Sequence, residues 1–129
     1  MPDYLDTSAF IKLVRSEPES VALRADIGYE SALVSSALLL VEGRRAAARY
    51  GSLARSRARA ALTTITLLPL DDATLERAAG LEPVELRSLD ALHLAAALSL
   101  GEDLRRFYCY DDRLVGAGAA LGLAVRRPG

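Results

Sequence analysis

Short apolar runs of strand type alternate with longer stretches of helical period along this chain of 129 residues. Such alternation is typical of βα units, in which parallel strands form one sheet and the helices pack on its faces. The expected strands are residues 2–6, 32–36, 65–70, 107–111 and 123–127. The expected helices are residues 7–14, 16–30, 36–50, 52–64, 71–81, 88–101 and 112–122. We therefore predict an α/β fold with a central parallel sheet flanked by helices.

Single residues indicate where these predicted helices begin, end or divide. Pro18 suits the first turn of the second helix, and Gly51 divides residues 36–64 into two helices. Ser88 is expected to cap the N-terminus of the helix that Gly101 ends. In the glycine-rich run of residues 116–122 we expect close helix packing, because too few residues follow for a dinucleotide-binding unit.

Length and composition limit the class of protein. The length suits one domain over residues 1–129, and the formal net charge of −1 gives no global basic field for nucleic acid. A single cysteine, Cys109, excludes an internal disulfide and suits a reducing cytosol. Neither a leader peptide nor a membrane-spanning run is evident. We expect a soluble, cytoplasmic protein.

Two aspartates follow predicted strands. Asp6 ends the first strand and Asp111 the fourth, at the carboxyl edge where open α/β sheets bind ligands. Each aspartate alone is more often a cap of the following helix. If the fourth strand runs through Asp111, that side chain emerges at the edge beside Asp6, and Asp112 is left to cap the last helix. We assign Asp111 to chemistry and Asp112 to capping.

Two further acids interrupt apolar helical stretches. Glu42 follows the run Ala37–Val41, and Asp90 lies among the apolar residues of 88–98. A buried carboxylate needs a partner or the mouth of a cleft. Arg45 or an exposed helix face would satisfy Glu42, and the dipole at its helix N-terminus would favour Asp90. Both ordinary explanations stay open.

The four acids near strand ends and helix starts have one shared interpretation. Like charges about 5 Å apart repel by roughly 3 kcal/mol at an effective dielectric near 20, so a cluster of them requires a cation. Oxygen ligands select Mg²⁺ or Mn²⁺ over zinc. Carboxylate-bound Mg²⁺ without a nucleophilic side chain is typical of phosphodiester hydrolysis by an activated water.

These segments resemble the PIN-domain family, and specifically the VapC-type toxins of toxin–antitoxin pairs. The similarity rests on YLDTSAFIKL at the start, Glu42 after its apolar run, LDALHLAAAL around Asp90, and CYDDRLVGAGAALGLAVRRPG at the end. It implies a Rossmann-like, three-layer PIN domain and an Mg²⁺- or Mn²⁺-dependent endoribonuclease that leaves a 3′-hydroxyl and a 5′-phosphate. It also implies a homodimer and a cognate VapB-type antitoxin.

By position, the resemblance assigns Asp6, Glu42, Asp90 and Asp111 as metal-binding and catalytic acids and Ser8 as their supporting residue. Gly43 departs from the family pattern, which usually has a bulkier residue there. His93, three residues after Asp90, is expected to be a packed, hydrogen-bonded structural residue rather than a catalytic one. Cys109 is expected to be an inert buried thiol.

Arginines dominate residues 44–59, where there is no acid: Arg44, Arg45, Arg49, Arg55, Arg57 and Arg59. Two interpretations stay open, an RNA-backbone track beginning with Arg44, Arg45 and Arg49, or a solvated face that meets an acidic partner.

Two rival functions remain as well. One is a non-catalytic RNA- or protein-binding module with this fold. The other is a receiver-like phosphoacceptor, which fits poorly because its acidic pair should follow the first strand and its lysine should come late, whereas Lys12 is early.

Overall fold

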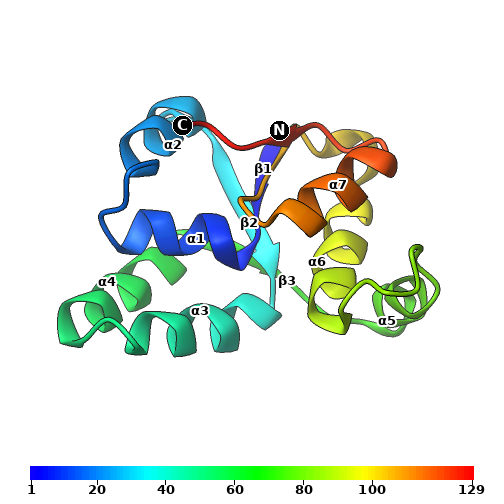
Figure 1. Cartoon of the computed structure of the whole chain (residues 1–129), viewed down its shortest axis with the longest axis horizontal. Coiled ribbons are helices and arrows are strands. Elements are labelled where there is room, and N and C mark those ends of the chain that lie inside the picture. Colours follow the sequence, from blue (N-terminus) through cyan, green and yellow to red (C-terminus); the bar gives the residue numbers. More distant parts are fainter.

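A five-stranded parallel sheet forms the centre of the computed structural model, which describes residues 1–129 (Figure 1). The strands lie in the order β3-β2-β1-β4-β5. They are β1 (Pro2–Leu5), β2 (Ala32–Ser36), β3 (Ile65–Leu68), β4 (Arg106–Tyr108) and β5 (Val125–Arg126). All four pairings between neighbouring strands are parallel, which confirms the predicted α/β fold class.

Seven α-helices connect and cover the strands. They are α1 (Thr7–Val14), α2 (Ser20–Ile27), α3 (Leu38–Ala48), α4 (Ser52–Leu62), α5 (Asp72–Ala79), α6 (Ser88–Leu98) and α7 (Asp112–Ala120). Gly51 separates α3 from α4 at a positive φ of 99°, a conformation that favours glycine, so the predicted division is confirmed. None of these helices has the length and apolar character needed to cross a membrane.

Two hydrophobic cores lie on opposite faces of the sheet. Successive strand residues alternate between them, so Leu5 and Tyr108 pack with α1 to α4 while Tyr4 and Phe107 pack with α6 and α7. Figure 1 shows the same division, with α1 to α4 on one side of the strands and α5 to α7 on the other. The predicted three-layer arrangement is therefore confirmed.

Gly43 marks the closest approach between α1 and α3. A Cβ atom there would lie 2.7 Å from Cε2 of Phe10, whose side chain is fully buried in the first core. A larger residue would force the helices apart, because a packed core yields little space. The departure from the family pattern is thus matched by Phe10, and it keeps the preceding residue, Glu42, close to α1.

Several predicted boundaries are wrong by a few residues. β4 ends at Tyr108 rather than Asp111, and α2 begins at Ser20, so Pro18 precedes the helix instead of lying in its first turn. Ser88 is the first residue of α6, and the capping position belongs to Arg87, whose side chain makes no capping hydrogen bond. Each error lies at an element end, where local signals are weakest.

Candidate active site

The order of the strands reverses direction at β1. Ligands of open α/β sheets bind at such a switch point, outside the carboxyl ends of the strands, and we call this region the crevice. β1 and β4 are neighbours there, and α1 and α7 begin beside each other at their carboxyl ends (Figure 1). Two hydrogen bonds join the two connections, since Asp6 N donates to Tyr108 O at 3.2 Å and Tyr110 N donates to the side-chain Oγ of Ser8 at 2.8 Å. The edge predicted to hold Asp6 and Asp111 therefore does hold both.

Asp6 is buried and held by short contacts from three directions. Its Oδ1 accepts from Ala9 N at 2.9 Å, which makes Asp6 the N-cap of α1. The Ser8 hydroxyl lies 2.7 and 2.8 Å from Oδ1 and Oδ2, and the Cys109 Sγ lies 3.1 Å from Oδ2. Burial raises the pKa of Asp6, although Ser8 and the other donors oppose the shift. Because Ser8 has one hydroxyl proton for two oxygens, the carboxylate retains acceptor capacity.

Asp111 is exposed and caps α7. Its Oδ1 accepts from Leu114 N at 3.1 Å, while its Oδ2 accepts no hydrogen bond within the chain. Asp112, predicted to be the cap, instead lies in the first turn of α7 and forms an ion pair with Arg127. That assignment was wrong because the strand ends three residues early, which leaves Asp111 in the extended conformation of a cap residue.

Asp90 lies in the first turn of α6 and accepts no hydrogen bond in the chain. Burial raises the pKa of its carboxyl group, and the negative charges of Asp111 and Asp6 raise it further. The charges of Asp6 and Asp111 therefore reach Asp90, which places the three acids in one region at the switch point. No arginine or lysine forms an ion pair with any of them.

Glu42 joins the crevice from α3 and is held by one oxygen. Its Oε1 accepts from Thr7 Oγ1 at 2.9 Å and lies 2.8 Å from His93 Nε2. Burial would raise the pKa of Glu42, but the hydrogen bonds and charge of its neighbours outweigh burial and lower it. Arg45, the ordinary partner considered from sequence, forms no ion pair with it.

His93 is buried, as predicted, and bridges Glu42 to the core. Its Nδ1 lies 2.7 Å from the hydroxyl of Tyr4, and its Nε2 also lies 3.2 Å from Thr7 Oγ1. Because the Glu42 carboxylate can only accept, Nε2 carries a proton and donates to it, while burial raises the pKa of Tyr4 and keeps its phenol protonated beside Nδ1. The histidine thus fixes the orientation of the Glu42 carboxylate.

Sequence reasoning missed three contributors. Thr7 and Tyr4 orient Glu42 and His93, and Cys109 donates to Asp6 instead of only filling core space. Burial raises the pKa of the Cys109 thiol, which keeps it protonated and able to donate. The only signal in the sequence was the hydroxyl of Thr7 directly after Asp6. A hydroxyl at the N-terminus of a helix is usually interpreted as a cap, so this signal did not indicate a contact with Glu42.

The donor chemistry of the crevice fits a hard divalent cation. All four carboxylates retain acceptor capacity, and the charges of Asp6 and Asp111 disfavour the ionised form of Asp90. As placed, however, no group of three or more His, Cys, Asp or Glu side chains forms a ready-made set of metal ligands. The acids converge on one region at the carboxyl ends of β1 and β4 without forming a closed coordination shell.

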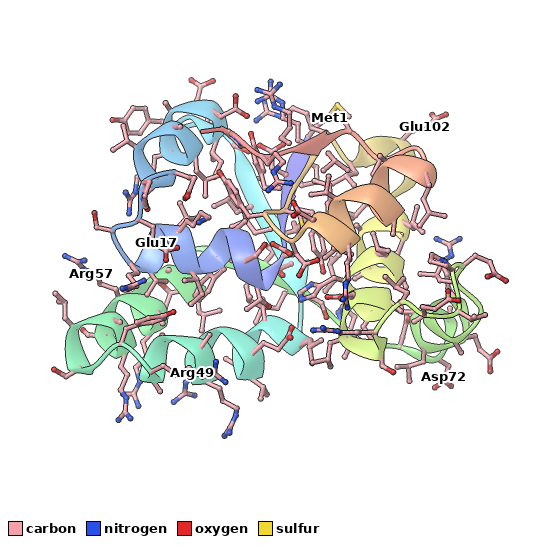
Figure 2. All side chains as sticks on the ribbon, in the orientation of Figure 1. Met1, Glu17, Arg49, Arg57, Asp72 and Glu102 are labelled. Atoms are coloured by element: carbon pink, nitrogen blue, oxygen red, sulfur yellow. The ribbon has the colours of Figure 1, made fainter.

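The arginines of residues 44–59 lie on α3 and α4 or, in the case of Arg49, directly after α3, and outside the crevice. Arg44, Arg45, Arg55 and Arg59 line a cavity of about 460 Å³ between α3 and α4, together with Leu40, Val41 and Ala48. Arg49 is exposed outside that lining, and none of these arginines forms an ion pair. In Figure 2 nitrogen-tipped side chains project outward from both helices, where Arg49 and Arg57 are labelled. None of the four acids lines this groove.

A family model named PIN domain matches residues 4–115, a span that contains all four acids. The chain belongs to the PIN-domain family. It is of VapC type, being 49% identical over 125 residues to Ribonuclease VapC46 of Mycobacterium tuberculosis, with 97% of this chain and 96% of that protein covered. The recognition made from the sequence is therefore confirmed.

Solved structures agree on the fold. VapC20 of Mycobacterium tuberculosis, described as a sarcin–ricin loop cleaving toxin, superposes with a TM-score of 0.74 at 19% identity over 97% of this chain and 98% of its own. A toxin–antitoxin complex from Klebsiella pneumoniae gives a TM-score of 0.73 at 21% identity, covering 98% of each chain. At these identities the likeness concerns the fold alone.

Proposed function

We propose that this VapC-type PIN protein is a metal-dependent endoribonuclease, the toxin of a toxin–antitoxin pair. The observation that carries the proposal is the convergence of Asp6, Asp90 and Asp111 at the switch point without any basic partner in an ion pair. Such a cluster is unfavourable by itself and becomes favourable when a cation neutralises it. A relative at 49% identity is named a ribonuclease, which supports RNA as the substrate.

Each residue of the crevice has a separate role in this proposal. Asp6, Asp90 and Asp111 hold the cation, directly or through water, and Glu42 completes the set from α3. Ser8 and Ala9 N keep Asp6 in one orientation, while Thr7 and His93 do so for Glu42. When bound, Mg²⁺ or Mn²⁺ supplies an activated water and neutralises charge on the scissile phosphate. Hydrolysis then leaves a 3′-hydroxyl and a 5′-phosphate.

Further parts of the proposal concern partners. Arg44, Arg45 and Arg49, which no acid of the chain neutralises, are suited to phosphates of a long RNA that extends from the crevice along α3. A VapB-type antitoxin silences the toxin, and a toxin–antitoxin complex among the fold neighbours supports that assignment. We also propose a homodimer, and a cytoplasmic location in keeping with the reduced Cys109.

A cleavage assay tests the activity. Purified protein is incubated with total RNA in Mg²⁺, in Mn²⁺ and in EDTA, beside an Asp6→Asn variant whose circular dichroism matches the wild type. We expect discrete RNA fragments from the wild type with either metal and at least about a thousandfold slower cleavage in EDTA or in the variant, the scale of several kcal/mol of charge stabilisation.

The same assay separates the rival function. RNA that is bound but not cut, with binding indifferent to EDTA and to Asp6→Asn, would identify a non-catalytic module. Sequencing of the new 5′ ends after induced expression would then identify which RNA is cut.

A further inference from the structure

A second cavity of about 460 Å³ opens beside the crevice, between the N-terminal part of α6 and the outer face of α7. Asp90 lines it, so the cavity is continuous with the acid cluster, unlike the arginine groove between α3 and α4. In Figure 1 the two helices concerned, yellow α6 and orange α7, lie next to each other. Cavities of about 300–1,000 Å³ are typical of small-molecule sites.

Small residues form the α7 wall of this cavity. Gly116, Ala117 and Ala120 line it at helical spacing, and a Cβ atom added at Gly116 would meet nothing within 4 Å. Gly118, two residues later, differs because its Cβ would lie 3.1 Å from Val125. The glycine-rich run therefore has two uses, since Gly118 permits the predicted close packing and Gly116 leaves space open.

Two arginines flank the same space. Arg87 and Arg113 line the cavity and form no ion pair within the chain. Of the acids on the wall besides Asp90, Asp112 is neutralised by Arg127, which leaves Glu85.

The combination of unpaired arginines, apolar side chains and small residues around this cavity suits the binding of one nucleotide. Guanidinium groups bind phosphates and stack on bases, and apolar walls such as Pro83 and Leu86 accept the face of a base. Single-stranded RNA is recognised mainly through unstacked bases held in such pockets. Because Asp90 lines this cavity, a nucleotide directly next to a scissile phosphate bound at Asp90 would lie at its opening.

We infer that the cavity between α6 and α7 is a specificity subsite that holds and selects a nucleotide adjacent to the scissile phosphate. The inference rests on the proposed function. Its continuity with Asp90 and its wall of small residues distinguish it from the α3–α4 groove, which has a similar volume and several unpaired arginines but is lined by none of the four acids.

Two neighbouring alanines provide a matched test. Ala120 lines the cavity, whereas Ala119 is exposed on α7 outside it, so Ala120→Leu and Ala119→Leu add the same side chain to adjacent positions. Gly116→Leu adds a side chain to the cavity wall and improves helix propensity, which makes misfolding an unconvincing explanation of its effect. Arg113→Gln removes one charge without filling space.

The first measurement is cleavage of an RNA pool with a randomised segment, read by sequencing the new 5′ ends. We expect a base preference at a position flanking the cut in the wild type and in Ala119→Leu. Ala120→Leu and Gly116→Leu should lower kcat/KM at least tenfold and change that preference, and Arg113→Gln should weaken it. Absence of a preference in the wild type, or an unchanged preference in the filled variants whatever their rate, would overturn the inference.

The second measurement decides the inference if the wild type cuts no RNA, a result that would refute the proposed function alone. ¹⁵N-labelled full-length protein in EDTA is titrated with AMP, CMP, GMP and UMP. Shifts of the amides of Arg87, Gly116 and Ala117 that persist in Ala119→Leu and vanish in Ala120→Leu would support a nucleotide site. Shifts confined to α3 and α4, or no shifts, would overturn it.

Discussion

Two buried aspartates lie at opposite ends of β1, Asp3 near its start and Asp6 directly after its last residue, and they have opposite surroundings. Asp3, at the amino edge, accepts from Arg105 Nε at 2.9 Å and from Ser31 Oγ, and its side chain is fully buried. Asp6, at the carboxyl edge, receives hydrogen bonds from uncharged donors and no ion pair. The two residues are three positions apart in the sequence, yet the chain neutralises the Asp3 carboxylate and not the Asp6 carboxylate.

The contrast extends to the rest of each edge. At the amino edge, Asp26 is paired with Arg106 and Arg126 and accepts from the Tyr108 hydroxyl at 2.7 Å. At the carboxyl edge, Asp90 and Asp111 have no such partner. Charge balance at the amino edge is internal and stabilises the fold, whereas at the carboxyl edge it must come from outside. This difference indicates which carboxylates are available for function.

Among substitutions, the largest expected effect on stability comes from replacing one of these two aspartates, Asp3, by asparagine. Asp3→Asn should lower the free energy of unfolding by about 2 kcal/mol, because the neutral amide loses the charge-assisted hydrogen bonds from Arg105 and Ser31. The cost stays below that of breaking a fully buried ion pair, since the Arg105 side chain is 39% exposed and can be hydrated. Asp6→Asn should cost less than about 1 kcal/mol, because Asn caps a helix as well as Asp does. Urea denaturation measures both.

The two variants should differ in the opposite sense in their RNA cleavage activity. Asp3→Asn should retain RNA cleavage at a temperature where it is folded, and Asp6→Asn should lose it. Comparable losses of stability in the two variants would remove the distinction between the edges.

A divalent cation should stabilise the protein through the carboxyl edge only. At a hundred times its dissociation constant, a ligand that binds only the native state adds about 2.7 kcal/mol. We expect Mg²⁺ or Mn²⁺ to raise the melting temperature of the wild type and of Asp3→Asn by differential scanning fluorimetry. The shift should be absent in Asp6→Asn. An equal shift in all three proteins would mean that the cation acts elsewhere.

Acid should weaken the amino edge through Asp26. Hydrogen bonding from Arg126 lowers the pKa of Asp26 against the effect of burial, with Tyr108 adding to the shift. A carboxyl group with a lowered folded pKa contributes stability above its ordinary pKa near 4 and loses it as pH falls through the folded value.

Asp26→Asn should therefore cost about 1–2 kcal/mol at pH 7 and little at pH 2 to 3. Urea denaturation at a series of pH values measures the difference. A cost that is the same at both ends of the series would show that the charge of Asp26 does not contribute.

Much of this fold followed from patterns that the chain displays locally. Alternating strand and helix periods gave the parallel sheet and its layers, and Gly51 gave the break between α3 and α4. Chain position also brought Asp6 and Asp111 to one edge, because the carboxyl ends of neighbouring parallel strands meet. The end of β4 was wrong because Phe107 to Tyr110 is apolar and aromatic beyond the last paired residue, Tyr108.

The supporting contacts of the site could not be predicted in the same way. The chain of hydrogen bonds from Tyr4 through His93 to Glu42 joins residues 89 and 51 positions apart, which no local pattern encodes. The amino-edge ion pairs of Asp3 and Asp26 were missed for the same reason. The cavity beside Asp90 needs the packing of α6 on α7, which sequence periodicity does not specify.

The smallest expected effects concern the adjacent aspartates that follow β4. Asp111→Ala should cost about 1 kcal/mol by removing the cap of α7, whereas Asp111→Asn should keep the cap and cost almost nothing. Asp112→Asn should cost at most about 0.5 kcal/mol, since its ion pair with Arg127 is exposed. Both Asp111 variants should lose RNA cleavage and Asp112→Asn should retain it. Loss of cleavage in Asp112→Asn alone would transfer the metal-binding role to the second aspartate.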